Sequence, residues 1–177
     1  MPIRQLDGLQ PRLSDSAFIV PRGLLIGDVE IGENVFVLPF VVIRRYVNSS
    51  TICNNTNIQD GSVLPVNSDS VLAPGGTPLS IGAQVTIGHQ CLLHGCEIGD
   101  HCLIGMGSTV MDRAVVERDV IIGAGSLVTP GKRLESGFLY AGSPARKVRP
   151  LKDTEAEYIE YSYKHYCDLK ERHRGAV

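Results

Sequence analysis

The stretch Ile87 to Gly99 reads IGHQCLLHGCEIG, and its residues Ile87, Leu93 and Ile98 belong to an aliphatic repeat that runs through most of the chain. The usual spacing of the repeat is six residues. An amphipathic helix repeats its apolar positions about every 3.6 residues and a half-buried strand about every two, so neither explains this spacing. Three short strands in each coil of a parallel solenoid explain it, because each coil stacks its aliphatic side chains on the next. The other aliphatic positions are Ile19, Leu25, Ile31, Val37, Ile43, Ile52, Ile58, Leu64, Ile81, Ile104, Val110, Val116, Ile122 and Val128.

A second inward position lies four residues after most of these aliphatic residues and holds a small or β-branched side chain. Glycine often follows the aliphatic residue directly, where a corner of the coil tolerates unusual dihedral angles. Two inward positions in each hexad predict a continuous core that is built coil by coil. The second positions are Val29, Val35, Val41, Val47, Thr56, Ser62, Val85, Cys91, Cys102, Ser108, Ala114, Val120 and Ser126.

The repeat is interrupted in three places, and interruptions of a solenoid map to loops that often form its binding face. Three extra residues separate Ile43 from Ile52, and the hexad from Leu93 to Ile98 is one residue short. Residues 66–80 are polar and rich in proline and glycine, which predicts a protruding loop. We therefore expect the irregular face to be the functional one.

A single domain is expected, with a β-helix over residues 1–150 and a C-terminal helix over residues 151–177 that packs on the solenoid. Thr154 and Glu157 have the spacing of a capping box, and Gly175 is placed to end the helix. A mixed polar and tyrosine face suggests that the helix lies along the outside of the solenoid. The residues expected on this face are Ile159, Tyr163, Tyr166 and Lys170.

Composition excludes several classes of protein. The net charge is -2 at pH 7 and no long run of like charges occurs, so we expect no nucleic-acid partner. No apolar stretch is long enough to cross a membrane, and no secretory signal precedes the repeat, so a cytoplasmic protein without a membrane partner is expected. An odd number of cysteines without CxxC spacing predicts free, buried thiols instead of a disulfide framework. They are Cys53, Cys91, Cys96, Cys102 and Cys167.

His89 and His94 are the candidate metal ligands. Their spacing of five differs from the i, i+4 spacing of a helical zinc motif, and on a solenoid it places them at successive corners. By themselves, two nearby histidines are also compatible with hydrogen-bonded surface or interface positions.

Six motifs together resemble the gamma-class carbonic anhydrase family of hexapeptide-repeat proteins, from about Ile19 into the C-terminal helix. The resemblance implies left-handed coils, a homotrimer, and zinc held between subunits by three histidines, two from one subunit and one from its neighbour. In that family the zinc-bound water attacks carbon dioxide, because zinc lowers the pKa of the water. The motifs are IRRYVN (43–48), TNIQDGSVL (56–64), IGHQCLLHGCEIG (87–99), LIGMGSTVMD (103–112), IIGAGSLV (121–128) and LYAGSPARKVR (139–149).

Matched by position, His89 and His94 correspond to the second and third zinc ligands of the family. Gln59 and Asp60 correspond to the Gln-Asp pair beside the metal, and Arg44 corresponds to an interface arginine. We therefore expect Gln59, Asp60, Arg44 and Tyr46, which stands at the place of a further interface residue of the family, to form the catalytic site, with the two histidines as metal ligands.

Two departures affect this expected site. Pro65 stands where the family has its first zinc-binding histidine, and Tyr46 stands where it has the interface aspartate. A possible zinc site therefore lacks its third protein ligand, and three protein ligands are usual for catalytic zinc. Among replacements, Cys91 is expected to point into the core and His101 to lie on the surface. Tyr46 is expected to fill the cleft as a neutral phenol, and Asp60 would become a ligand only if the site rearranged.

Three functions follow as alternatives. The first is a trimeric, gamma-carbonic anhydrase-like lyase with a degenerate zinc site that hydrates carbon dioxide. The second is a non-catalytic or repurposed trimer that binds bicarbonate or another small anion, with Arg44 and Arg45 as its guanidinium groups. The third is a hexapeptide acyltransferase with a histidine as general base, although we identify no acyltransferase-specific motif.

Overall fold

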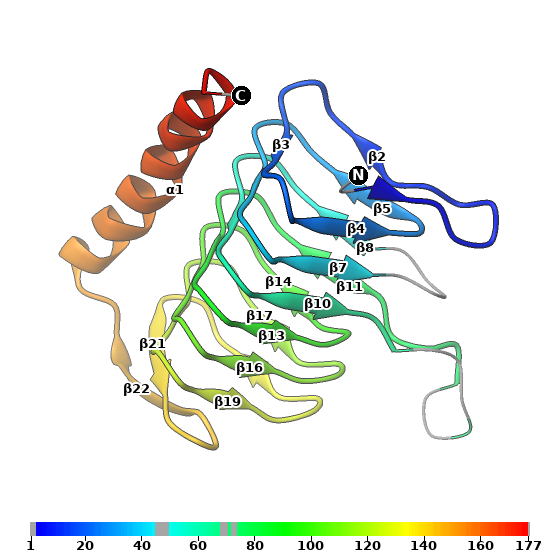
Figure 1. The fold of residues 1–177 in the computed structure, drawn as a ribbon. Coiled ribbons are helices and arrows are strands. Elements are labelled where there is room, and N and C mark those ends of the chain that lie inside the picture. Colours follow the sequence, from blue (N-terminus) through cyan, green and yellow to red (C-terminus); the bar gives the residue numbers. More distant parts are fainter. Residues whose placement is uncertain (1–2, 45–49, 68–70, 72–73, 177) are drawn as a thin grey trace.

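The fold is a left-handed parallel β-helix with one C-terminal helix, as the repeat and the family resemblance predict (Figure 1). The computed structural model describes residues 3–44, 50–67, 71 and 74–176. Each coil contributes one short strand to each of three sheets, which we call faces I, II and III in the order in which the chain visits them. All strand pairs are parallel except the last pair of face III, β21 and β22, which is antiparallel.

The strands are two to five residues long. Face I contains β1 (Ile3–Arg4), β4 (Leu24–Ile26), β7 (Val42–Arg44), β10 (Val63–Pro65), β13 (Leu92–Leu93), β16 (Thr109–Val110) and β19 (Leu127–Val128). Face II contains β2 (Arg12–Leu13), β5 (Val29–Ile31), β8 (Ser50–Ile52), β11 (Leu79–Ile81), β14 (Glu97–Ile98), β17 (Val115–Val116) and β20 (Arg133–Leu134). Face III contains β3 (Phe18–Ile19), β6 (Phe36–Val37), β9 (Asn57–Ile58), β12 (Thr86–Ile87), β15 (Leu103–Ile104), β18 (Ile121–Ile122), β21 (Phe138–Ala141) and β22 (Arg146–Pro150).

The core is made of the two inward positions predicted for each hexad. The aliphatic positions from Leu25 to Val128 are at most 2% exposed, and Ile19 packs against them from the first full coil. The second positions are equally buried, including polar ones such as Thr56 and Ser62. Val47 lies outside the described residues. Burial of these columns stabilises each coil through its neighbours, as expected for a solenoid.

The long interruption emerges between β10 and β11. Asn67 and Thr77 form an antiparallel bridge that closes the base of this loop, with backbone hydrogen bonds of 3.1 and 3.3 Å. The loop therefore leaves the solenoid after face I and returns to start face II.

Helix α1 (Asp153–Arg174) has its N-cap at Lys152 and the acidic N3 residue at Glu155, two residues before the predicted capping box of Thr154 and Glu157, so that prediction of the cap is wrong. The carboxylate of Glu155 accepts a hydrogen bond from the backbone N–H of Lys152 at 2.9 Å. It also binds the guanidinium of Arg149 at 2.7 and 2.8 Å. These bonds fix the first turn of the helix at Asp153, because an acidic side chain here satisfies a free N–H group.

The predicted inner face of α1 is confirmed. Ile159, Tyr163 and Lys170 are buried and Tyr166 is half-buried, while Ser162 is a further buried residue that the sequence did not suggest. The helix packs on β6, β9 and β12, so it covers face III (Figure 1). It is too polar to qualify as a membrane span, and no other helix occurs in the described part of the chain.

The outward sides of the three faces differ in chemistry. Face III lies under α1. Face II presents charged and polar residues such as Glu30, Ser80 and Glu97 at corresponding positions of successive strands. Face I presents a column of mainly apolar residues, and no helix of the described chain lies on it. The column on face I consists of Leu24, Val42, Val63, Leu92, Thr109 and Leu127.

Candidate functional site

The two candidate histidines lie on opposite edges of face I. His89 follows β12, at the corner where the chain passes from face III to face I. His94 follows β13, at the corner where the chain passes from face I to face II. A strand of face I therefore separates the two imidazoles within one subunit, and the fold does not bring them together.

His94 is held by a carboxylate from the next coil. Its Nδ1 atom lies 2.8 Å from Oδ1 of Asp112, and both side chains are partly buried. Asp112 was missed as a site residue, although the spacing of eighteen residues is three hexads and thus one whole coil. This coil-length spacing is the sequence signal that would have found it.

His89 is held in the same way by a carboxylate from the preceding coil. Its Nδ1 atom lies 2.9 Å from Oδ2 of Asp60, a residue that the family resemblance had placed in the site. A carboxylate on Nδ1 favours the tautomer in which Nδ1 carries the proton and Nε2 is left as an acceptor. Each histidine can therefore present Nε2 to a metal ion or to a hydrogen-bond donor.

Pro65 lies between Arg44 and His94 along one edge of face I. The register pairs Pro65 with Arg44 in the preceding coil, and the pairing of Val63 with Leu92 places Pro65 opposite His94 in the following coil. Pro65 is buried and Arg44 is exposed. The residue that replaces the expected first zinc ligand is thus the direct neighbour of His94, and it has no ligating atom in its side chain.

None of the described alternatives replaces this ligand. Cys91 is 1% exposed, as predicted, and its thiol donates to the backbone oxygen of Gly105 at 3.3 Å. Burial raises the pKa of the Cys91 thiol, which disfavours the thiolate that zinc requires. Tyr46, together with Arg45, lies outside the described residues.

His101 is not the exposed surface histidine that we expected. It lies at the third corner, between faces II and III, where its Nδ1 atom is 2.7 Å from Oδ1 of Asp119. Its ring is 6.4 Å from that of Tyr163 on α1, and only 19% of its side chain is exposed. The helix covers this corner, which explains the difference from the sequence expectation.

The zinc centre implied by the resemblance does not fit one described chain. Over residues 3–44, 50–67, 71 and 74–176, no three His, Cys, Asp or Glu side chains are grouped so that they could hold a metal ion. His89 and His94 would have to come from different subunits to share an ion. Even then the set would contain two imidazoles and not three.

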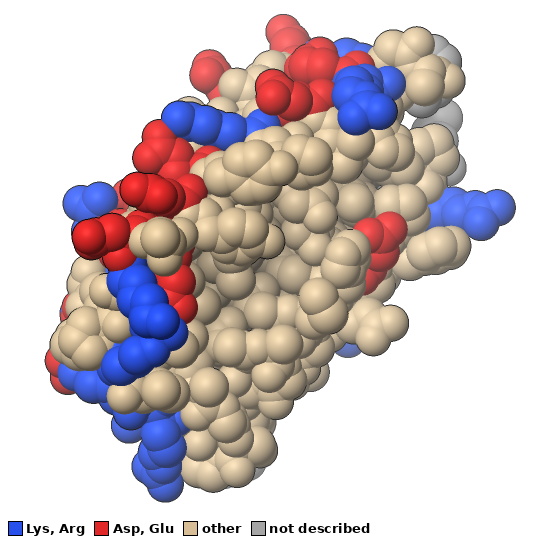
Figure 2. Space-filling model, turned by 90° about the vertical axis from the view of Figure 1, so that its left-hand side faces the viewer, with Lys and Arg blue, Asp and Glu red and all other residues tan. Residues whose placement is uncertain are grey.

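A cavity of about 290 Å³ lies between face III and helix α1, and His89 is part of its wall. Gln59 and Met106 line it from the solenoid, and Tyr158 and Tyr166 line it from the helix. Figure 2 views the molecule from the helix side, where charged side chains gather along the left-hand and upper edges and the hollowed middle carries few of them. Tyr158 and Tyr166 were not predicted as site residues, because their position beside His89 depends on how α1 docks on face III.

A chain of buried hydrogen bonds connects this cavity with the helix. Gln59 Nε2 donates to Asn57 Oδ1 at 3.2 Å, and Asn57 Nδ2 donates to Thr86 Oγ1 at 2.9 Å. The Thr86 hydroxyl in turn bonds the Ser162 hydroxyl of α1 at 2.9 Å. All four side chains are at most 6% exposed, so the amide of Gln59 is fixed by the fold.

The chain is similar to several known proteins in sequence and in fold. The family model "Bacterial transferase hexapeptide (six repeats)" matches residues 78–110 and 95–130. Protein YrdA of Escherichia coli K12 is 47% identical over 171 residues, which cover 97% of this chain and 93% of YrdA. The mitochondrial gamma carbonic anhydrase 2 of Arabidopsis thaliana is 37% identical over 163 residues, 92% of this chain and 58% of that protein. The crystal structure of a hexapeptide transferase family protein from Anaplasma phagocytophilum has a TM-score of 0.86 and 38% identity, covering 99% of this chain and 98% of that one.

Proposed function

The chain belongs to the gamma-carbonic-anhydrase-like family of hexapeptide-repeat proteins, and on this basis we propose that it is a homotrimer that binds a small anion, such as bicarbonate, between its subunits. The observation that carries the proposal is the row Arg44, Pro65, His94 on one edge of face I. Compared with the family pattern, the row keeps the guanidinium of Arg44 and the imidazole of His94, but Pro65 stands between them where the family has a histidine.

The outward side of face I supports the trimer. Its apolar column, which includes Val63 and Leu92, lies between the two edges that carry His89 and His94. Burial of apolar side chains is the main favourable term in protein association. Packing three copies through face I would cover this column and bring His94 of one subunit toward His89 of the next.

The chemistry of the edge supports anion binding. The guanidinium of Arg44 is a planar, permanently charged donor that suits carboxylate-like anions. The imidazole of His94 adds a second polar group, with its orientation set by Asp112. With Nδ1 bonded to Asp112, Nε2 of His94 accepts a hydrogen bond, so the hydroxyl group of bicarbonate can donate to it while the other oxygen atoms accept from Arg44.

Zinc-dependent hydration of carbon dioxide is not what we propose, because Pro65 cannot supply the third protein ligand of a catalytic zinc site. A metal ion held by two histidines is the second candidate. It is favoured by the carboxylates of Asp60 and Asp112, which bind Nδ1 of His89 and His94 as carboxylates do behind metal-bound histidines.

Thermal unfolding in the presence of bicarbonate tests the proposal. A ligand that binds the native state raises the unfolding temperature, so bicarbonate at tens of millimolar should raise it relative to sodium chloride of equal ionic strength. Arg44→Met should abolish the bicarbonate effect. Arg12→Met serves as the control, because Arg12 lies on face II and pairs with Asp28.

Two results would contradict the proposal. The first is an equal effect of bicarbonate on wild type and Arg44→Met. The second is a stoichiometric metal ion in protein purified without added metal or a histidine tag, which would establish the second candidate. Protection by coenzyme A but not by bicarbonate would favour the acyltransferase alternative.

A further inference from the structure

Helix α1 follows the corner between faces II and III, antiparallel to the direction in which the coils advance. At this corner one residue of each successive coil has a positive φ angle between 54° and 59°. Such a residue turns the chain sharply, and its side chain lies at the corner, where the helix runs. These residues are Asn34, Asn55, Gln84, His101 and Asp119.

The helix contacts this corner about once per coil. Gln84 Nε2 donates to the Tyr163 hydroxyl at 3.2 Å, and the Cys167 thiol lies 3.9 Å from Asn55 Oδ1. Adjacent strands are about 4.8 Å apart and a helical turn rises about 5.4 Å, so the two repeats nearly match over a few coils. Corner side chains can therefore define the register of the helix along the solenoid.

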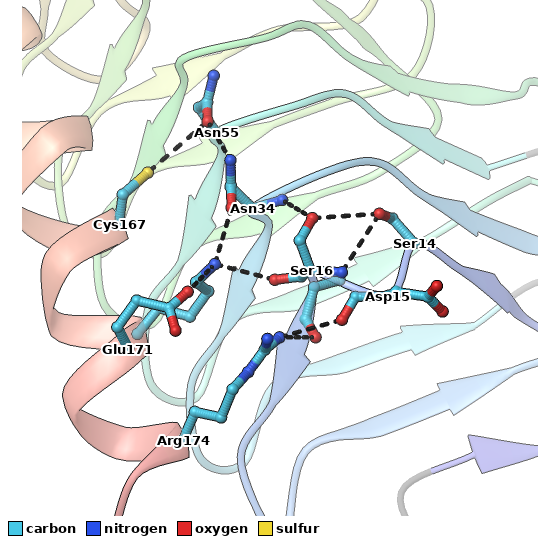
Figure 3. Close-up of polar contacts among 10 residues, drawn as sticks. Ser14, Asp15, Ser16, Asn34, Asn55, Cys167, Glu171 and Arg174 are labelled. Atoms are coloured by element: carbon cyan, nitrogen blue, oxygen red, sulfur yellow. Dashed lines mark hydrogen bonds and ion pairs between the residues drawn. The ribbon is translucent and has the colours of Figure 1, made fainter.

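Lys170 makes the most buried of these contacts. The side chain is 1% exposed, and Nζ donates to the backbone oxygen of Ser16 and to Asn34 Oδ1, each at 2.9 Å. It also binds the carboxylate of Glu171 at 2.6 Å (Figure 3). An ammonium group is buried at little cost only where its N–H groups find acceptors, and three acceptors are present at this one position.

Arg174 reinforces the same end of the helix. Its guanidinium donates to the backbone oxygens of Asp15 and Ala17 at 3.3 and 2.9 Å (Figure 3). Asn34, the acceptor for Lys170, is itself held, because its Nδ2 donates to Asn55 Oδ1 at 3.2 Å. The C-terminal end of α1 is thus bonded to the first coils of the solenoid through a connected polar network.

The first half and the middle of α1 supply the wall of the cavity that contains His89. Tyr158, Ser162 and Tyr166 line this cavity, and Ser162 fixes the buried chain that ends at Gln59. A helix that loosened or shifted by one turn would remove the Ser162 hydroxyl from Thr86. The shape of the cavity therefore depends on the register of the whole helix.

We infer that Lys170 is a positioning residue for this cavity: it holds α1 in the register that places Ser162 against Thr86 and the tyrosines beside His89. The inference deepens the proposed function and rests on it in one respect: His89, which the proposed trimer would bring toward His94 of the next subunit, is part of the wall of this cavity. Lys170 itself lies one turn beyond Tyr166 and is absent from the cavity wall. It acts by limiting undocking of α1 from face III.

Cysteine labelling measures this undocking directly. Ser162→Cys places a thiol at a position that is 6% exposed against face III, so its labelling rate rises when α1 undocks. In this background, Lys170→Met should speed labelling of residue 162 roughly tenfold, because several buried hydrogen bonds are lost. The matched control is Lys164→Met, which removes an exposed lysine of the same helix that pairs with Glu160.

The thiol of Cys96 serves as the internal reference, because it is 2% exposed and precedes β14 of face II, whereas α1 packs on face III. Peptide mass spectrometry separates the two sites. Faster labelling at residue 162 with an unchanged rate at Cys96 supports the inference. An unchanged rate at residue 162 in Lys170→Met, or a parallel rise at Cys96, overturns it. If Lys170→Met does not fold, Asn34→Ala removes one acceptor of Lys170 and is judged by the same two rates.

The labelling requires neither anion binding nor trimerisation. The labelling result can therefore be interpreted even if the protein does not bind bicarbonate. A negative labelling result likewise leaves the bicarbonate test unaffected.

Discussion

His94 and Asp112 lie in consecutive coils, with Nδ1 of the imidazole 2.8 Å from Oδ1 of the carboxylate. The carboxylate fixes the orientation of the ring and favours one tautomer, because it accepts a hydrogen bond from Nδ1–H. His89 and Asp60 repeat this arrangement at the other edge of face I. The fold thus holds two oriented imidazoles on the two edges of face I, where the proposed trimer would bring His94 of one subunit toward His89 of the next.

Asp112→Asn tests this orientation. In the wild type we expect neutral His94 to be protonated at Nδ1, whereas in the variant the amide can donate or accept, so the Nε2-protonated tautomer should gain population. Nitrogen chemical shifts of the imidazole measure the two forms. Asp119→Asn is the matched control, because it alters the equivalent bond of His101 at another corner. An unchanged His94 tautomer in Asp112→Asn would contradict the assignment.

Leu92→Lys tests the trimer. Leu92 lies in the middle of the apolar column on face I, and a lysine there would place three charges in the proposed interface. Wild-type protein should have a solution mass of about 58 kDa, three times the 19.2 kDa of one chain, and the variant should have the mass of a monomer. Light scattering measures both.

Ser80→Lys is the control for this experiment. Ser80 is an exposed, outward residue of face II, which we expect to face solvent. It should leave the trimer intact. Equal masses for Leu92→Lys and wild type would remove face I as the contact surface.

Glu155→Gln tests the N-terminal cap of α1 through its pH dependence. Hydrogen bonds from Arg149 and the backbone of Lys152 lower the pKa of Glu155 to about 2. A lowered pKa means that the folded state favours the carboxylate, so this stabilisation is present above the ordinary pKa of the group, 4.5, and is lost as the pH falls toward 2. The variant should therefore unfold at a lower temperature than wild type at pH 7, and the difference should shrink between these two values.

The measurement is thermal unfolding followed by circular dichroism at several pH values. Glu157→Gln, at an exposed neighbour on the same helix, is the control. A difference between Glu155→Gln and wild type that stays constant down to pH 2 would show that the charge of Glu155 has no part in the cap.

The fold was predictable because its signal is repeated in every coil. A single spacing of six residues, such as that between Ile87 and Leu93, does not identify a fold, but its repetition along the chain is typical of a parallel β-helix. The positions that the repeat predicts to point inward are the buried ones. The N-cap of α1 was misplaced because it occurs once and depends on a side chain, Glu155, that also binds Arg149 from outside the helix.

The site was less predictable because its contacts join separate coils and the helix. Asp112 reaches His94 only after the coils stack, and Ser162 reaches Thr86 only after α1 docks. His101 was expected to be exposed for the same reason, since its covering comes from Tyr163. In contrast, the departure at Pro65 was visible in the sequence, and the structure adds that its neighbours along the edge are Arg44 and His94.

The most direct test of the account is the zinc content of Pro65→His compared with wild type, measured by elemental analysis after equilibration with zinc and removal of the excess. Pro65 stands beside His94 on the edge of face I, and we propose that it is what separates this site from a three-histidine zinc centre. We expect about one zinc ion per subunit in a trimeric Pro65→His protein, loss of this zinc in Pro65→His combined with His89→Ala, and little zinc in wild type. Stoichiometric zinc in the wild type, or none in a folded, trimeric Pro65→His protein, would contradict this proposal.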